Sequence, residues 1–379
     1  MRIAYLDNSA TTRVCGLAAQ KVYEVMTQRY GNPSSLHTKG LEAERELTLA
    51  RAQLSEMLGC RPGELYFTSG GTEANNLAIL GGAAARRRQG NRVVVSAIEH
   101  SSVLEPAKEL EKQGFEVIYL SPNHQGIVER EEIFKWINSS TVLVSLQLVN
   151  NELGTVQPVE ALSAAVRRAK APALIHVDAV QAFGKIPVKP NKLGADLLTV
   201  SGHKIHGPKG VGALFVAKDV HILPRTFGGG QEKKLRPGTE SVPLIAGFGA
   251  AAAALPELSE SYDRIEELKK LCMEELEQME GIVINSPERS VPYILNISVP
   301  GIRSETMLHH LAAQGVYVSS GSACSKGQKS HVLRAAGFPE GLIDSALRIS
   351  FSHENTQEDV RQLLDGVKSG LATLARARK

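Results

Sequence analysis

The sequence has few cysteines, and they lie far apart in the chain. Four occur in 379 residues, and no two stand in a CxxC arrangement. Structural zinc sites and disulfide frameworks both need clustered or paired cysteines. Neither is therefore predicted, and each cysteine must be judged alone: Cys15, Cys60, Cys272 and Cys324.

An excess of one charge and long apolar runs are also missing. Lys and Arg number 43 against 40 Asp and Glu, which disfavours a dedicated surface for nucleic acid or acidic membranes. The N-terminal segment lacks the sustained apolar stretch of a signal peptide. The small-residue run from 246 to 255 is too short and too alanine-rich to span a bilayer. We expect a cytoplasmic protein with no membrane contact and no direct nucleic-acid partner.

The chain is longer than the usual single core, so two domains are expected. From residue 65 onward, short apolar runs alternate with amphipathic helical stretches, which is typical of an α/β fold. The predicted strands are 65–68, 93–98, 115–120, 141–149, 173–177, 195–200 and 211–216, with helices at 73–89, 101–113, 130–137 and 158–170. This rhythm predicts a mostly parallel sheet covered by helices on both faces.

The last third of the sequence changes its pattern. Strands are predicted at 282–284, 293–299, 316–319 and 347–351, and helices at 304–314, 331–336 and 356–374. Thr356 and Asp359 have the spacing of a capping box at the start of the last helix. We therefore divide the chain into a large α/β domain, 15–255, and a small α+β domain, 256–379, which also takes in residues 1–14.

Open parallel sheets bind ligands at the carboxyl ends of their strands, so the residues after each apolar run carry functional information. The segment TSGGTEANN, which includes Gly71 and Thr72, combines a strand end, a glycine turn and a helix start. Free backbone N–H groups at such a helix start favour a phosphate, and a simple turn is the alternative. The glycine-rich stretch 228–240, which ends in Thr239 and Glu240, also suits an anion.

Lys204 follows another predicted strand in the sequence VSGHKIHGPKG. A lysine on a glycine-flanked turn can lose solvent, which lowers its pKa and makes its amine a nucleophile for carbonyl groups. Schiff-base chemistry is the resulting hypothesis, and a solvated lysine before a hairpin is the alternative. Asp178 at a buried strand end needs a cation, such as the protonated ring nitrogen of pyridoxal phosphate; a helix-cap or turn aspartate is the other interpretation.

Three further polar residues follow predicted strands. His100 could stack on a planar cofactor and move protons, although a hydrogen-bonded structural histidine is the alternative. Asn151 and Gln181 could bind oxygen atoms of a cofactor or substrate, and loop capping is their ordinary role.

Two residues of the predicted small domain stand out. Cys324 lies in the small-residue segment SSGSACSKG, near Lys326 and Lys329. It is either a thiolate with a lowered pKa or an inert surface thiol, and the sequence leaves both interpretations open. Arg348 lies within a predicted strand, where an arginine needs an anion. That anion is either a substrate carboxylate or a structural Asp or Glu.

Taken together, the motifs resemble one family, the cysteine desulfurases of the NifS/IscS type. These are pyridoxal-phosphate enzymes of the class V aminotransferase-like group, with the fold called type I. The matching stretches span almost the whole chain in order. They are YLDNSATT, YGNPSSLH, FTSGGTEANNLAI, IEHSSV, VNNELGTVQP, HVDAVQAFGK, SGHKIHGPKGVGAL, LRPGTE, SSGSAC and LRISF.

The resemblance implies a role for each candidate residue. Lys204 would hold pyridoxal 5'-phosphate as a Schiff base, with Asp178 paired to the ring nitrogen and His100 stacked on the ring as proton carrier. Asn151 and Gln181 would bind the oxygen side of the cofactor, and Asn151 with Arg348 would bind the substrate carboxylate. The remaining residues would hold the phosphate: Gly71, Thr72, Ser201, His203 and, from the partner subunit of a homodimer, Thr239.

The resemblance also implies the reaction. L-cysteine would become L-alanine while its sulfur passes to Cys324 as a persulfide, and then to an iron–sulfur scaffold or a tRNA-thiolation protein. The segment after Cys324, SKGQKSHVLRAAG, is shorter and more basic than in many members, which leaves the acceptor open. The alternatives are a selenocysteine lyase, another pyridoxal-phosphate transferase on the same scaffold, and a non-catalytic sulfur-transfer scaffold.

Overall fold

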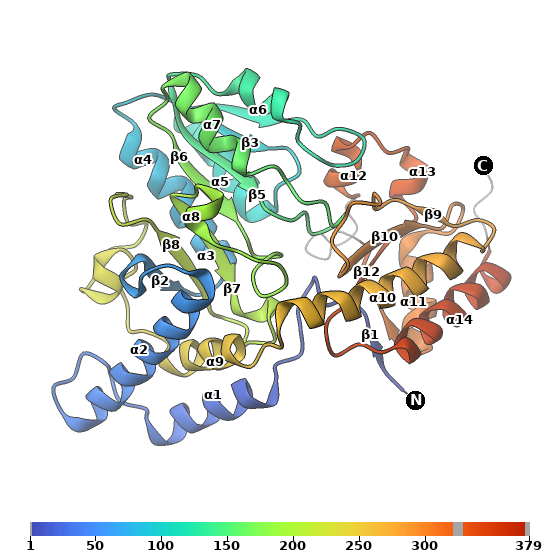
Figure 1. The fold of residues 1–379 in the computed structure, drawn as a ribbon, viewed down its shortest axis with the longest axis horizontal. Coiled ribbons are helices and arrows are strands. Elements are labelled where there is room, and N and C mark those ends of the chain that lie inside the picture. The colour runs from blue at the N-terminus through green and yellow to red at the C-terminus, as the bar shows by residue number, and fades with distance from the viewer. Residues whose placement is uncertain (1, 321–328, 376–379) are drawn as a thin grey trace.

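The computed structural model describes residues 2–320 and 329–375 (Figure 1). Its largest sheet has seven strands in the order β2-β8-β7-β6-β5-β3-β4. Four of the six pairings are parallel, and β8 is antiparallel to both its neighbours, so β2 runs in the same direction as the other strands. The strands are β2 Leu65–Thr68, β3 Arg92–Ser96, β4 Glu116–Leu120, β5 Thr141–Gln147, β6 Leu174–Asp178, β7 Leu197–Ser201 and β8 Gly212–Val216. The predicted mostly parallel sheet is confirmed.

Successive residues of β3 enter two different hydrophobic cores, as expected for side chains that alternate across a strand. Val93 and Val95 pack with the helices that follow β2 and β3, whereas Val94 packs with the helices that follow β4 and β5. The covering helices are α3 Gly71–Asn76, α4 Gly82–Arg86, α5 Ser101–Lys112, α6 Arg130–Trp136, α7 Glu160–Ala169 and α8 Pro190–Leu193. Helices therefore cover both faces, which explains the near-continuous apolar character of the strands.

The predicted helix 73–89 begins two residues earlier and is not uniform. Between α3 and α4 lies a π-helical segment, η2 Leu77–Gly81, all of whose residues are buried. Such wide turns are rare and often occur near functional sites. Here η2 continues α3, whose first turn lies at the strand ends.

A smaller sheet and its helices form the other side of the molecule (Figure 1). Three antiparallel strands have the order β12-β10-β9, with β9 Val283–Ile284, β10 Ile294–Ser298 and β12 Ala346–Ser350. The N-terminal strand β1 Ala4–Tyr5 pairs with β11 Val316–Tyr317. The helices here are α10 Leu258–Glu277, α11 Ser304–Ala313, α12 His331–Ala335, α13 Glu340–Ile343 and α14 Gln357–Thr373. The capping box of Thr356 and Asp359 is present as predicted.

Three helices pack together beside the large sheet: α1 Gly16–Gln28, α2 Thr38–Leu58 and α9 Val242–Ala253. Helix α2 ends at Gly59, which has a left-handed φ of 64° as expected for a C-terminal glycine. The predicted strand 316–319 is shorter than expected, because only Val316 and Tyr317 pair with β1 and Ser319 instead bridges to Arg348. The proposed domain boundary at residue 256 falls between α9 and α10.

Among the described residues, no single helix combines the length and apolar content that crossing a membrane requires. Helices α9 and α10 reach that length and composition only as a pair bent by 79°.

Candidate active site

The carboxyl ends of the parallel strands bring the predicted residues to one edge of the large sheet. The turn after β2 lies directly against the end of β7, since a Cβ on Gly71 would be 3.7 Å from the Ser201 Cβ. The same Cβ would be 3.0 Å from Val180, which follows β6. Gly212 of β8 approaches Gly70 so closely that a Cβ would lie 2.7 Å from its carbonyl carbon. The glycines thus let the turn and two strands meet without side chains between them.

Lys204 ends a short 3-10 turn, η3 Gly202–Lys204, directly after β7. Its half-buried amine donates hydrogen bonds to the carbonyl oxygens of Ser9 and Ala10, the latter at 2.9 Å. The N-terminal segment is in turn fixed to this turn, because the Thr12 N–H donates to the His203 carbonyl at 2.9 Å. The lysine is therefore held by the chain on the inner side of the site, unlike a solvated hairpin lysine.

Asp178, the last residue of β6, is held as a buried carboxylate. It is 7% exposed, and it accepts hydrogen bonds from the Asn75 side chain at 2.7 Å and from the Val180 N–H at 2.9 Å. Both of these donors are neutral, and a buried anion gains most from a cation. The Val180 contact corresponds to the turn aspartate that the sequence left open as an alternative. It uses one carboxylate oxygen of Asp178, and the other oxygen faces Asn75.

His100 caps helix α5 and is linked to Asp178 through two side chains. Its Nδ1 accepts the Ser102 N–H at 3.1 Å, so the ring proton resides on Nε2. The Ser102 hydroxyl lies 2.7 Å from the same Nδ1 and accepts from Asn75 at 2.8 Å. Burial lowers the pKa of His100, an effect opposed by the Asp178 charge. The histidine is thus both a structural cap and a neutral ring with one N–H.

Glu99, directly before His100, is fully buried, and its carboxyl group is held neutral. Burial, with a contribution from the Asp178 charge, raises the pKa of Glu99 from 4.5 to about 8. One of its oxygens accepts from Ser96 at 2.7 Å and from the Gln147 N–H at 2.8 Å. These bonds join the ends of β3 and β5 beneath His100.

We expect Glu99→Gln to make the stability of the protein less sensitive to a rise in pH between 4.5 and about 8. Because its pKa is raised on folding, Glu99 stabilises the fold relative to its ionised form below pH 4.5, and this contribution is lost as pH rises toward 8. The stability advantage of the Glu99→Gln variant over wild type should grow by about 1.4 kcal/mol per pH unit across that window. Unfolding curves from pH 5 to 8 measure it. Glu105→Gln, at a side chain 66% exposed, is the control, and a pH-independent difference would refute the assignment.

Two basic groups beside Lys204 are kept neutral or nearly so. Burial, reinforced by the Lys204 charge, lowers the pKa of His203 to about 3. Burial together with the charges of Lys204 and Arg348 lowers the pKa of Lys185 to about 7. The His203 ring contacts the Thr11 hydroxyl at 3.2 Å. The Lys204 amine thus lies among buried basic groups, a setting that favours a bound anion.

Ser201 supplies an unsatisfied hydroxyl next to this lysine. Its side-chain oxygen is fully buried and has no hydrogen-bond partner among the described residues. An unpaired buried hydroxyl costs free energy, so its position calls for a ligand. Ser201 is the last residue of β7 and adjoins the glycine turn, which makes an anion at that turn the natural partner.

Arg348 and Gln181 are engaged by the N-terminal segment. The 2% exposed Arg348 pairs with Asp7 at 3.0 Å and donates to the Asn151 carbonyl at 2.9 Å. The structural carboxylate left open by the sequence is therefore present. Gln181 donates to the Ser9 carbonyl at 2.9 Å, and its oxygen lies 3.4 Å from the Lys185 amine. Asn151 itself is half-buried beside Arg348.

One sequence-predicted residue, Thr239, is exposed on the loop before α9 and has no described contact with this arrangement. Cys324 lies outside the described residues. The thiols of two other cysteines are held in the neutral form, because burial raises the pKa of Cys60 to about 11 and that of Cys272 to about 12.

Several residues that shape the site were not assigned a role from the sequence. Asn75 and Ser102 connect Asp178 to His100, and Asp7 pairs with Arg348. The stretches YLDNSATT and TSGGTEANN contain Asp7 and Asn75, but nothing in their spacing shows which distant partner each side chain meets. Only the fold supplies that information.

Comparisons with known proteins show which family the chain belongs to. A family model described as Aminotransferase class-V matches residues 4–363. A cysteine desulfurase IscS of Methanosarcina thermophila is 40% identical over 97% of this chain and 91% of its own length, and cysteine desulfurase IscS 1 of Archaeoglobus fulgidus is 41% identical over 95% of both. The chain belongs to the cysteine desulfurases of the class-V aminotransferase family. A solved NifS-like protein has a TM-score of 0.93 at 39% identity, covering 99% of this chain and 100% of that one.

Pyridoxal phosphate is the cofactor of this family, and the residues present fit it. The unpartnered Ser201 hydroxyl and the first turn of α3 suit a phosphate, and the buried Asp178 carboxylate suits a protonated ring nitrogen. Lys204 follows β7 at the same edge of the sheet, and its amine contacts the N-terminal segment at the Ala10 carbonyl.

Proposed function

We propose that this desulfurase converts L-cysteine to L-alanine and collects the released sulfur on Cys324. One observation carries the proposal. The Lys204 amine is fixed by backbone carbonyls, and three residues before it the Ser201 hydroxyl is buried without a hydrogen-bond partner. A nucleophilic amine beside an unsatisfied hydrogen-bonding group describes a site for a phosphorylated aldehyde.

We assign the cofactor contacts as follows. The phosphate is bound by backbone N–H groups at Gly71 and Thr72 and by Ser201 and His203. Asp178 holds a proton on the ring nitrogen, and Asn75 orients that carboxylate through its 2.7 Å hydrogen bond. His100 covers the ring, and Gln181 donates to its oxygen side, since its amide is fixed by Ser9 and Lys185. When bound, the cofactor supplies an electron sink for charge that develops on the substrate Cα.

The chain's own residues then bind the substrate and move its protons. Arg348 and Asn151 bind the amino-acid carboxylate, which joins the anion Asp7 already at the guanidinium. Lys204 would accept the Cα proton at its amine. His100 presents an N–H at Nε2 and is neutral because burial lowers its pKa, so it can exchange a proton with the substrate thiol.

Sulfur transfer itself is assigned to Cys324. Its thiolate attacks the substrate sulfur, so an S–S bond forms while the substrate C–S bond breaks and its electrons return to the carbon skeleton. The protonated skeleton leaves as alanine, and the persulfide on Cys324 is passed to an acceptor protein, either an iron–sulfur scaffold or a tRNA-thiolation protein. The neutral thiols of Cys60 and Cys272 support the choice of Cys324.

We further propose a cytoplasmic homodimer. Large apolar side chains are exposed on α1, including Tyr23 at 68% and Met26 at 60%, and the molecule also exposes Phe227 at 88%. Patches of this kind mark protein interfaces. A partner packed there would bring its own exposed Thr239 to the phosphate. The molar mass of the holoenzyme, measured by light scattering, tests whether the protein is a dimer.

The decisive experiment maps sulfur after reaction with cysteine. The purified holoenzyme is incubated with L-cysteine, and mass spectrometry locates the thiol that has gained a sulfur atom. We expect it on Cys324, with Cys324→Ala forming neither persulfide nor sulfide while retaining bound cofactor. Sulfur on Cys15, Cys60 or Cys272 would contradict the assignment. Full sulfide release by Cys324→Ala would indicate a lyase, and a chain that takes up no cofactor would indicate a non-catalytic scaffold.

A further inference from the structure

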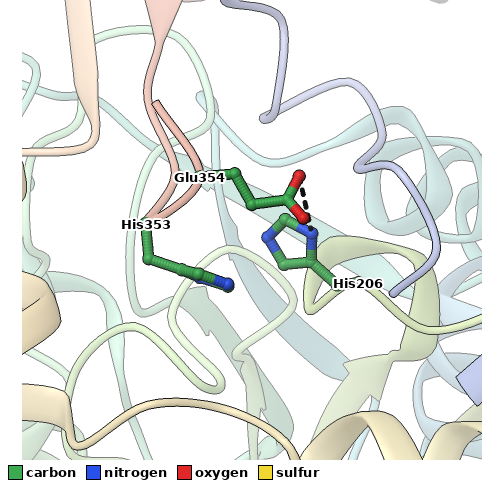
Figure 2. Close-up of side chains that lie close together, drawn as sticks. All are labelled: His206, His353 and Glu354. Atoms are coloured by element: carbon green, nitrogen blue, oxygen red, sulfur yellow. Dashed lines mark ion pairs between the residues drawn. The ribbon is translucent and has the colours of Figure 1, made fainter. Parts of the chain in front are cut away.

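A second cluster of titratable side chains lies behind Lys204, and the proposed reaction makes no use of it. His206 follows Lys204 by two residues, and His353 and Glu354 lie in the turn between β12 and α14. One ligand atom from each of the three lies within 4.8 Å of the others. Figure 2 shows the side chains converging from these two separate loops. Within the described part of the chain, no other set of three histidine, cysteine or carboxylate groups comes so close.

The His206 ring is already set as a metal ligand would be. It is 4% exposed, and its Nδ1 lies 3.0 Å from the Arg13 carbonyl oxygen. A carbonyl only accepts, so Nδ1 carries the ring proton and Nε2 presents its lone pair. Histidines that bind metals commonly donate their other ring N–H to a backbone carbonyl. His206 also has a left-handed φ of 61°, a conformation that is costly outside glycine and often found at functional sites.

Arg13 supports the carboxylate ligand as well. Its guanidinium donates to one oxygen of Glu354 at 3.0 Å, and the other oxygen lies 3.8 Å from Nδ1 of His206. The His353 ring lies next to the His206 ring, with centroids 4.5 Å apart and planes inclined by 56°. Ligand atoms of two imidazoles and one carboxylate therefore lie within 4.8 Å of one another, and Arg13 contacts both His206 and Glu354.

We propose that His206, His353 and Glu354 bind a Zn²⁺ ion, with a water molecule as the fourth ligand. Two nitrogen ligands and one carboxylate oxygen are a common set for zinc with an open position. The adjoining cavity has a volume of about 30 Å³, which is room for one water. Ligand atoms around tetrahedral zinc are about 3.3 Å apart, so the more accessible His353 and Glu354 close onto the ion while buried His206 stays in place.

The bound ion ties the loop after Lys204 to the turn before α14. These segments belong to the large and the small sheet regions, so zinc joins the two halves of the molecule at their junction. Lys185 and Lys204 line the same cavity, and each amine opposes a divalent cation when it is protonated. We therefore expect reversible binding with a dissociation constant on the order of micromolar, weaker than a structural zinc site. The proposal is independent of the desulfurase reaction.

Zinc binding is tested on the full-length holoenzyme without an affinity tag. Cys324→Ala is the background in every sample, because a free thiolate would compete for the metal. Calorimetric titration with Zn²⁺ alone should give one ion per chain. His353→Ala and Glu354→Gln, made separately, should each weaken binding at least about tenfold. His221→Ala, which removes an exposed histidine elsewhere, should leave it unchanged.

Location and folding are checked in parallel. Crystals soaked in zinc should show anomalous scattering between the three side chains, and both variants should keep the circular dichroism of the parent. No saturable binding below about 100 μM would overturn the proposal. So would equal affinity in His353→Ala, or an anomalous peak at any other group.

Discussion

Replacing Lys204 by alanine should reduce desulfurase activity at least about 10³-fold, because one side chain supplies both the covalent attachment and the proton acceptor. The variant should fold, since the hydrogen bonds that it loses to the Ser9 and Ala10 carbonyls come from an amine that is only half-buried. It should still bind pyridoxal phosphate through the phosphate and ring contacts. The visible absorption of a lysine-linked cofactor should be absent. Activity with cysteine and the absorption spectrum of the purified protein measure both effects.

Lys185 is the alternative nucleophile that this experiment must exclude. Its pKa of about 7 would leave much of its amine neutral, and it lines the same cavity as Lys204. Its amine, however, already contacts the Tyr293 ring at 4.8 Å and the Gln181 oxygen at 3.4 Å. Lys204 instead follows the strand end that carries Ser201. Geometry therefore favours Lys204.

Borohydride reduction of the wild-type holoenzyme and peptide mapping distinguish the two lysines. The reduced cofactor should be found on the peptide that contains Lys204. Lys209→Ala, which removes an exposed lysine of the same loop, is the matched control and should behave as wild type. A tag on Lys185, or an unchanged spectrum in Lys204→Ala, would refute the assignment.

The order of strands and helices in the large sheet could be predicted because it is reflected in local periodicity. Buried parallel strands such as Thr141–Gln147 are mostly apolar runs, and this strand is followed by the amphipathic helix α7. Strand ends were located for the same reason, which is how Asp178 and Lys204 were selected. Strands at 211–216 and 316–319 were predicted, but the antiparallel direction of β8 and the pairing of β1 with β11 were not, because a pairing partner is chosen by the fold.

The part of the site that could not be predicted from the sequence consists of contacts between residues far apart in the chain. The Lys204 amine meets carbonyls almost two hundred residues away, and Arg348 meets Asp7 from the other end of the chain. A backbone carbonyl has no sequence signature, since every residue has one. For Arg348 the residue type indicated that an anion was needed, but both a substrate and a structural carboxylate remained open. Tertiary structure supplied Asp7.

Asp178→Asn should lower kcat by about 10²- to 10³-fold while the cofactor stays bound, because asparagine keeps the shape but loses the charge that holds a proton on the ring nitrogen. Asparagine can still accept from the Val180 N–H, which bonds to Asp178 at 2.9 Å. The substitution therefore removes one charge from a buried site with little change in packing. Steady-state kinetics with cysteine, together with the bound-cofactor content, measure the effect.

The variant Asn75→Ala separates charge from orientation. It removes the 2.7 Å hydrogen bond to Asp178 and the link to Ser102, but it leaves the carboxylate in place. A loss of about tenfold is expected, since a group that only orients a catalytic residue contributes less than the residue itself. If Asp178→Asn kept full activity, or Asn75→Ala lost more than it, the buried charge would not be the feature that activates the ring. A larger loss in Asp178→Asn than in Asn75→Ala would instead show that the negative charge of Asp178, at the end of β6, is what activates the ring.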